Sequence, residues 1–436
     1  MPPVPHAQQA VPARPALEVL FALLIALALG TTGASPALGA ATEIEVWYGE
    51  SPDPVYDATF QAIADAFQER NPDIRLNVDF IGHPGGWEDR LIASIAGGTP
   101  PDVAYIDARI ANEYRVRGLM TPLNAYLERL APDAMQVENW IPNGPREYSY
   151  QGVWYGIPFR TDIRGLFINE RLAEQAGVDP HQAPANIDEL DQMAQKLSRQ
   201  EGDGTISILG FNPNRNNLNS LYWSLAFGAE FYDWENNRLR FDDPGVLEAL
   251  AWMVEYAERY GVANWGTEAK FQAESLAMHV NSTTTNSQLP HQRPDLRYWV
   301  HPLPYQPDGR NPTHSSVLGP MMPQGARHPE EAARFLAYLS EPETQLAWYR
   351  GTGSLPARAE ALRAAVREMT DPRELNLVMQ WPVTNARHPL FQQVRTDPRN
   401  GWRHWYERVM RGQASPQELV ANMMLWNREL EAIFGQ

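Results

Sequence analysis

The sequence predicts an α/β fold with a parallel sheet, and three observations lead to this prediction. Strand-like and helix-like segments alternate through residues 43–118. The strand-like segments are short and apolar or alternate between apolar and polar residues, and the helices between them have one apolar face. The chain has 436 residues, which is enough for two lobes of ordinary domain size. Strands that alternate with helices form a parallel sheet covered by those helices.

The first strand is expected at Glu43–Tyr48, where apolar and polar residues alternate. A helix follows, since Phe60 and Phe67 belong to an apolar face of helical spacing. This helix ends before Pro72, because a residue that precedes proline avoids the helical conformation. The alternation continues with a strand at Ile74–Phe80, a helix at Trp87–Ala96, a strand at Val103–Ile106 and a helix at Ile110–Arg117.

A second region begins at Tyr155–Phe159 and continues with a strand at Gly165–Ile168. The proline-rich segment Arg293–Pro312 is expected to connect back to the first region. Proline and two glutamates then begin a helix at Pro329–Leu339. Beyond Gly351 the chain is predicted to be helical and is rich in tryptophan. Further helices of the second region are predicted near Asn186–Arg199, Leu218–Phe227 and Pro244–Tyr260.

The N-terminal segment is typical of an export signal. Residues 19–30 are apolar, but this run is shorter than the roughly 20 residues that span a bilayer. Small residues at Ala37–Ala41 suit signal peptidase, so residues 1–41 are the predicted signal and the mature chain begins between Ala40 and Thr42. No cysteine follows, so we expect a periplasmic protein without a lipid anchor. A buried N-terminal helix is the alternative, which the polar, proline-rich flanks disfavour.

Composition excludes several classes of function. The net charge of −17, from 53 acidic and 36 basic residues, predicts a surface that repels nucleic acid and anionic membranes. The absence of cysteine excludes disulfides, thiolate metal sites and cysteine nucleophiles. Histidines show no metal-ligand spacing, and no Gly-x-Ser-x-Gly motif is present. We therefore predict no catalytic residues, no metal and no cofactor. Many of the 14 tryptophans and 17 tyrosines are expected in the core, and exposed rings would suit flat ligands such as sugars.

Three loops follow the predicted parallel strands. They are Gly49–Ser51, Gly82–Trp87 and Asp107–Arg109. In open parallel sheets the ligand crevice lies beyond the carboxyl ends of the strands. These polar or glycine-rich loops are therefore expected to border a binding crevice.

The order of motifs resembles the solute-binding proteins of ABC importers, in their carbohydrate class. The resemblance covers the whole mature chain, and each motif is weak alone but informative in this order. The motifs are Glu45–Tyr48, Phe67–Pro72, Gly97–Val103, Gly156–Phe159, Leu166–Asn169, Ala176–Pro180, Ala277–Met278, Glu330–Leu336 and Gly353–Pro356.

This resemblance implies a two-lobed α/β fold of the type II periplasmic binding protein class, with parallel-core sheets and hinge-connected lobes. Solute is held between the lobes, which close by a hinge motion, and no bond in the ligand is broken. The implied partners are a carbohydrate or polyol ligand and the membrane permease, and the chain is expected to be a monomer. The predicted first lobe is 42–157 with 304–352, and the second is 158–303 with 353–436.

Within the class, the C-terminal half is most similar to the glycerol-3-phosphate branch. Ala277–Thr285 stands where that branch has a phosphate-contacting loop, and Gly351–Pro356 and Arg399 also match. The chain departs from the branch at Ala108, where a ligand Glu is expected nearby, and at Ser354, where the branch has Tyr. These departures favour a neutral or weakly charged carbohydrate over a polyol phosphate.

Predicted ligand contacts come from the crevice loops and the matching motifs. The Trp87 ring would stack on a sugar face, and the Asp107 carboxylate would accept hydroxyl hydrogen bonds unless it caps a helix. Arg160 and Asp162, just beyond the lobe crossing, either reach the ligand or pair with each other. Arg399 is the candidate for anion contact, or else a surface ion pair.

The remaining candidates offer short polar groups, backbone access or a ring. Gly319 permits close backbone approach or a simple turn. Trp223 either stacks on the ligand or belongs to the core. The polar candidates are Glu50, Asn281, Ser282, Thr283 and Ser354, for which a solvated loop is the alternative at 281–283.

Two other functions stay open at this point. The first is a binding protein for glycerol-3-phosphate or a glycerophosphodiester. The second is a secreted glycan-active enzyme, in which two carboxylates about 5–9 Å apart would flank a glycosidic bond. The sequence has many carboxylates but no paired catalytic signature and no eightfold βα rhythm.

Overall fold

The structure is a computed structural model, and it describes most of the chain beyond the predicted signal. The predicted signal through Ala40, the crevice-loop residues 82–86 and Glu50 lie outside the described residues. None of the described helices is long and apolar enough to cross a membrane. The described ranges are 41–49, 53–81, 87–214, 217–230, 232–233, 236, 238–261, 267–313, 315–378, 394, 397 and 399–429.

A six-stranded mixed sheet forms the centre of the first lobe, in the strand order β15-β6-β14-β3-β1-β2. Strands β2, β1 and β3 pair in parallel, which confirms the predicted alternation of strands and helices. Strands β14, β6 and β15 extend the sheet antiparallel. The bounds are Thr42–Tyr48 for β1, Ile74–Phe80 for β2, Val103–Asp107 for β3, Arg160–Thr161 for β6, Val317–Met321 for β14 and Leu355–Pro356 for β15.

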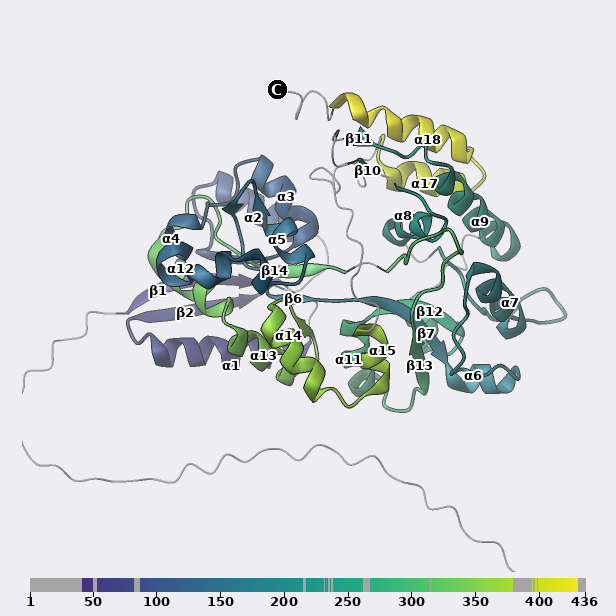
Figure 1. Ribbon diagram of the computed structural model, residues 1–436, viewed down its shortest axis with the longest axis horizontal. Helices are drawn as coiled ribbons and strands as arrows, with labels where there is room; N and C mark the ends of the chain where they lie inside the picture. Colours follow the sequence, from purple (N-terminus) through teal and green to yellow (C-terminus); the bar gives the residue numbers. More distant parts are fainter. Residues whose placement is uncertain are drawn as a thin grey trace, which may run out of the picture. The chain divides into compact units, whose positions relative to one another are not determined.

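Helix α1 (Pro54–Arg70) shows why the predicted helices form where they do. The Asp53 carboxylate accepts a hydrogen bond from the Val55 amide, and proline occupies the first turn. The helix ends at Asn71, before Pro72, as predicted. In Figure 1 α1 lies below β1 and β2, whereas α2 and α3 lie above them. The other helices of this lobe are α2 (Trp87–Ala96), α3 (Ala108–Val116), α4 (Asn124–Leu130), α5 (Asn143–Tyr148), α12 (Pro329–Leu339), α13 (Pro342–Thr352) and the 3-10 turns Pro132–Met135 and Val137–Asn139, with a hairpin of β4 (Ser149–Tyr150) and β5 (Val153–Trp154).

The second lobe is built on a three-stranded sheet in which β7 (Arg164–Asn169) lies between β12 (Met278–Ser282) and β13 (Tyr298–His301). Both pairings are antiparallel, so the parallel core belongs to the first lobe. Strand β13 lies inside the segment that the sequence analysis treats as a proline-rich connection. Its four residues are too few to show a periodicity, and its pairing with β7 comes from tertiary structure.

The helices of the second lobe follow the predicted pattern closely. Helix α9 (Pro244–Tyr260) has the predicted bounds, and α7 (Ile187–Leu197) and α8 (Asn217–Ala226) differ from the predictions by one or two residues at their ends. Beyond Gly351 the described chain is mainly helical, as predicted, except for the two-residue strand β15. The remaining elements of this lobe are α6 (Glu170–Gln175), β8 (Arg199–Gln200), β9 (Ile206–Ile208), β10 (Tyr232–Asp233), β11 (Arg238–Leu239), α10 (Glu268–Gln272), α11 (Thr283–Gln292), α15 (Pro372–Val378), α17 (Trp402–Met410) and α18 (Pro416–Met424). Helix α14 (Ala359–Glu368) instead packs against α13 and β15 of the first lobe.

The chain passes between the two sheets at two clear points. It runs from β6 of the first sheet directly into β7 of the second, and it returns from β13 to β14. Strand β15 brings Leu355 and Pro356 back beside β6 in the first sheet. The two lobes are therefore joined through neighbouring strands, and the exact division of the chain between them stays a prediction.

Candidate functional site

At the carboxyl end of β3, two charged residues lie level with each other across the strands of the first sheet. We call residues that are register partners across neighbouring strands a row. Leu318 of β14 is the register partner of both Asp107 on β3 and Arg160 on β6. Pro356 of β15 is in turn the partner of Arg160. Residues that are paired across strands point to the same face of a sheet. Asp107 and Arg160 therefore lie on one face at the strand end where a ligand crevice is expected.

Arg160 connects this row to the second lobe. Its side chain is almost fully buried, with 4% of the residue exposed. Its Nη1 donates a hydrogen bond to Thr284 Oγ1 on α11 at 3.4 Å, and its guanidinium lies 6.0 Å from the centre of the Tyr56 ring. Burying an arginine costs free energy unless its five N–H donors have hydrogen-bond acceptors. Arg160 therefore links this end of the first sheet to α11 of the second lobe.

Tyr148 holds the end of β3 in place from α5. Its hydroxyl donates to the Ile106 carbonyl at 2.8 Å, one residue before Asp107. Burial raises the pKa of Tyr148 well above its ordinary value, the Asp107 charge raises it further, and Arg160 opposes this. The phenol is therefore protonated at physiological pH and is a fixed donor. We name Asp107, Tyr148, Arg160 and Thr284 the Asp107–Arg160 cluster.

Asp162 has partners other than Arg160 in the described residues. Its Oδ1 accepts a hydrogen bond from the Ser316 amide at 2.7 Å, and its Oδ2 lies 3.2 Å from Arg164 Nη1. Asp162 is 6% exposed. These contacts tie the crossing between β6 and β7 to the residues just before β14, so Asp162 stabilises the connection between the sheets.

The predicted polar loop at 281–283 is the end of β12 and the start of α11. Asn281 accepts from the Ser282 amide and the Thr285 hydroxyl, and it donates to Glu268 Oε2 at 3.2 Å. Thr283 Oγ1 accepts from the Ile163 amide at 3.2 Å. Ser282 is the N-cap residue, but its side chain makes no capping hydrogen bond, and the first turn contains no acidic residue. Asn281 and Thr283 thus position this helix start, where amide donors favour an anion or a hydroxyl oxygen.

Gly319 on β14 and Ser354 just before β15 are both buried. A Cβ atom on Gly319 would come within 1.9 Å of the Ile157 carbonyl oxygen, so the close approach that this glycine permits is to the chain's own backbone. Ser354 is fully buried, and in the described part of the chain its hydroxyl has no hydrogen-bond partner. A buried hydroxyl of this kind needs a water molecule or a ligand group.

The other candidates lie apart from the cluster or outside the described atoms. Trp223 is 2% exposed and packs 5.1 Å from Trp252 and 6.1 Å from Phe211, so it belongs to the core of the second lobe. Trp87 begins α2 as predicted, but its side chain is not described. Arg399 is exposed, and its amide donates to Asp397 in a turn before α17.

Sequence analysis did not identify Tyr56 or Tyr148. Tyr56 lies in the first turn of α1, and Tyr148 ends a six-residue helix. Neither position has a motif or a periodicity that distinguishes it from core tyrosine. Only the register of β3 against β14 and the docking of α5 show that Tyr148 supports the end of β3.

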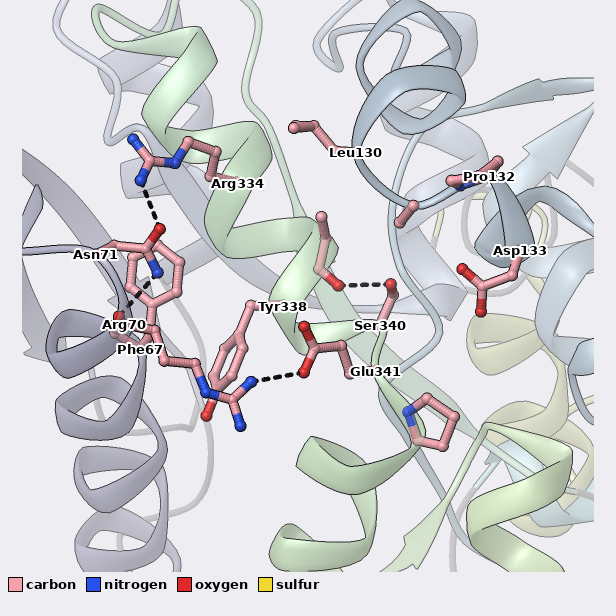
Figure 2. Close-up of a pocket in the computed structure, with 13 residues that line it drawn as sticks. Phe67, Arg70, Asn71, Leu130, Pro132, Asp133, Arg334, Tyr338, Ser340 and Glu341 are labelled. Carbon is pink, nitrogen blue, oxygen red and sulfur yellow. Dashed lines mark hydrogen bonds and ion pairs between the residues drawn. The ribbon is translucent and has the colours of Figure 1, made fainter.

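A separate hollow of about 390 Å³ lies at the other end of α1 (Figure 2). It is lined by the last turn of α1, the segment after α4, and the α12–α13 connection, and we name it the α1–α12 pocket. Its charged residues are paired within the chain: Arg70 contacts Glu341 at 3.0 Å, and Arg334 contacts Asn71, which Figure 2 also shows. None of the predicted ligand residues lines it. Among the described residues no group of histidine and acidic side chains could hold a metal ion.

The comparison with known families assigns the class. The family model of the bacterial extracellular solute-binding proteins matches residues 62–372, from α1 to the start of α15. The chain therefore belongs to the bacterial extracellular solute-binding protein family, whose members are binding proteins and not enzymes. This confirms the predicted family and excludes the secreted glycan-active enzyme as the function.

Relatives and solved structures agree with this assignment. A putative binding protein of Brucella abortus is 24% identical over 69% of this chain and 73% of its own length. The sn-glycerol-3-phosphate-binding periplasmic protein of Escherichia coli is 23% identical over 76% and 77% of the two chains.

The solved structures are similar in fold. A solute-binding protein of Thermotoga lettingae, bound with α-D-tagatose, is 21% identical with a TM-score of 0.74, covering 90% of this chain and 100% of that one. An ABC substrate-binding protein of Listeria monocytogenes, in complex with cycloalternan, is 18% identical with a TM-score of 0.75, covering 91% and 99%. These likenesses confirm the predicted type II periplasmic binding protein fold.

Proposed function

We propose that this protein is the periplasmic component of an ABC importer and that it holds a sugar, an oligosaccharide or a related polyol between its lobes. The observation that carries the proposal is the Asp107–Arg160 cluster, in which two buried charges of opposite sign share one face of the sheet and Arg160 contacts Thr284 at the start of α11 from the other lobe. A carboxylate accepts hydroxyl hydrogen bonds, and a guanidinium donates them in a fixed plane. Such a pair suits a ligand with many hydroxyls and no net charge.

The proposed ligand site keeps most of the predicted set, without Trp223, which packs in the core of the second lobe, and Gly319, which packs against the Ile157 backbone. The residues kept are Glu50, Trp87, Asp107, Arg160, Asp162, Asn281, Ser282, Thr283, Ser354 and Arg399. Within this set Asp107 and Arg160 are proposed as direct contacts. Asp162, Asn281 and Thr283 are proposed to act mainly by positioning the strand crossing and the start of α11, because their polar atoms already have partners in the chain.

A polyol phosphate is the second candidate, and two observations favour it. The first turn of α11 has amide donors and no acidic residue, which suits an anion. The Escherichia coli relative named above is a glycerol-3-phosphate-binding protein. Against this candidate, the Asp107 carboxylate stands in the same row as Arg160 and would repel a phosphate.

A ligand screen decides between the candidates. We expect sugars or oligosaccharides to raise the melting temperature, since a ligand at 100 times its Kd stabilises a protein by about 2.7 kcal/mol. Calorimetry should then give tight binding of a neutral carbohydrate that changes little with salt. Micromolar binding of glycerol-3-phosphate, about −8 kcal/mol, without binding of neutral sugars, would contradict the proposal. In that case Arg399→Ala should remove most of the affinity and its salt dependence, whereas for a neutral sugar its effect should be small.

The proposal also covers export and partners. We propose that residues 1–41 are cleaved on export, that no lipid anchor is attached, and that the protein acts as a monomer that delivers its ligand to the permease. Fractionation should place the protein in the periplasm, and mass spectrometry of the purified protein should give a chain that begins between Ala40 and Thr42. An intact Met1 in the periplasmic protein would contradict the cleavage. Light scattering measures the molar mass in solution and so tests the monomer. Delivery is tested by asking whether the ligand-loaded protein stimulates ATP hydrolysis by the permease complex.

A further inference from the structure

Helix α11 of the second lobe presents one face to the first lobe. Three of its residues, Thr284, Ser287 and Gln288, are spaced as i, i+3 and i+4, which places them on the same side of a helix. Each makes a hydrogen bond to a first-lobe residue. The contacts are Arg160 Nη1 to Thr284 Oγ1 at 3.4 Å, Tyr56 with Ser287 Oγ at 3.3 Å, and Gln288 Nε2 to Asp53 Oδ2 at 3.1 Å.

The direction of the middle contact follows from the number of available protons. The Ser287 hydroxyl has one proton and donates it to the Thr284 carbonyl at 2.7 Å. Tyr56 is therefore the donor in the contact between its hydroxyl and Ser287 Oγ. Asp53 has two roles, because Oδ1 caps α1 while Oδ2 accepts from Gln288. The capped start of α1 is thus the structure that α11 contacts.

These contacts lie on the ligand side of the hinge. Asp53 and Tyr56 follow β1, and Arg160 shares a sheet row with Asp107 at the end of β3. The carboxyl ends of parallel strands border the crevice, so a motion that opens the crevice separates α11 from α1. The three hydrogen bonds therefore favour the arrangement in which the lobes are together.

A glycine at the end of α13 allows this close approach. Gly353 has a positive φ of 71° and ends α13. A Cβ atom there would come 2.9 Å from the Ser287 Cβ. Both the left-handed backbone and the short distance to α11 require glycine at this position.

From these contacts we infer an interlobe clamp, made by Tyr56 on α1 and its N-cap residue Asp53 with Ser287 and Gln288 on α11. This clamp sets ligand affinity by holding the lobes together without touching the ligand. Arg160 extends the clamp into the proposed ligand site through Thr284. The inference deepens the proposed function, since the clamp regulates the same crevice. Its residues are positioning residues.

Affinity gives the first test. The double variant Tyr56→Phe with Gln288→Ala removes two interlobe hydrogen bonds and leaves the Tyr56 ring in the core. We expect a Kd for the best carbohydrate of the screen that is higher by about twentyfold, and by about fivefold for each single variant, because a hydrogen bond contributes about 1 kcal/mol. The matched control is Gln292→Ala, one turn further along α11, where the side chain contacts Gln272 within the second lobe. An unchanged or lower Kd in the double variant, or an equal loss in the control, would overturn the clamp.

The distance between the lobes gives a second test that needs no ligand. The chain has no cysteine, so spin labels can be placed at Glu69→Cys on α1 and Gln195→Cys on α7, both exposed. We expect the unliganded double variant to show a broader and longer distance distribution than the labelled parent. If the screen finds no carbohydrate ligand but this shift occurs, the clamp stands and the proposed function fails. Identical distance distributions in the double variant and the labelled parent would contradict the clamp, whichever ligand the protein binds.

Discussion

The Asp107–Arg160 cluster lies near the start of α1, where Arg160 approaches Tyr56, and the α1–α12 pocket lies at the end of the same helix. The two regions differ in how far their charged side chains are exposed to water. Tyr56 and Arg70 are separated along α1 by about 20 Å at 1.5 Å per residue. At the cluster, Asp107 and Arg160 are 7% and 4% exposed. In the pocket, the side chains of the Arg70–Glu341 pair are 60% and 42% exposed.

The two regions therefore differ in how strongly water screens their charged groups. Exposed ion pairs contribute little, about 0–1 kcal/mol, because water competes for both groups. Buried charged groups lose that solvation and must be compensated by partners or by a ligand. The pocket has its charges compensated within the chain. The cluster joins two lobes at the strand end where ligands bind.

The largest expected effect is at Arg160. Arg160→Met keeps the length of the side chain and removes the positive charge from the row that also contains Asp107. We expect calorimetry to show an affinity loss of about 100-fold, or about 2.7 kcal/mol, as is usual for a buried arginine at a binding site. Arg146→Met, on the exposed side of α5, is the control. If both variants bind equally well, Arg160 does not contact the ligand.

A smaller effect is expected at Tyr148. Tyr148→Phe removes the donor to the Ile106 carbonyl and leaves this buried oxygen with one partner fewer. We expect the free energy of unfolding to fall by about 1–2 kcal/mol and the Kd to rise by about fivefold, because the end of β3 is less well held. Thermal unfolding and calorimetry measure the two changes. Tyr126→Phe on α4 is the control, and a loss of stability with unchanged affinity would limit Tyr148 to a structural role.

The smallest effect is expected in the α1–α12 pocket. Hydrogen bonds from Arg334 lower the pKa of Asp73 below its ordinary value of 3.8. A lowered folded-state pKa stabilises the protein above pH 3.8, and the stabilisation is lost as pH falls through the lower, folded-state value. Because Asp73 is exposed, Arg334→Gln should cost less than about 1 kcal/mol at pH 7 and leave ligand affinity unchanged. Urea unfolding at pH 7 and pH 3 measures the difference, and a lower affinity would show that the pocket influences the crevice.

The sequence predicted the elements that have a strong local signal. Helices α9 and α12 have the predicted bounds, because proline begins each one and a regular apolar face continues through it. The parallel β1, β2 and β3 were recognisable from alternating or continuous apolar residues. The family was also recognisable from its motifs, and the family model confirms it.

Tertiary structure decided what depends on contacts between distant segments. Strands β6 and β15 have two residues each, and β14 includes a glycine and a proline, so none of them has a local signal. Their pairing brings Arg160 into the row of Asp107, and it is stabilised by the sheet and not by their own sequences. The packing of α11 against α1 likewise joins residues more than 200 positions apart. The sequence determined the elements and the class of protein because their signals are local, whereas the candidate site and the proposed interlobe clamp arise only when folding brings distant side chains into contact.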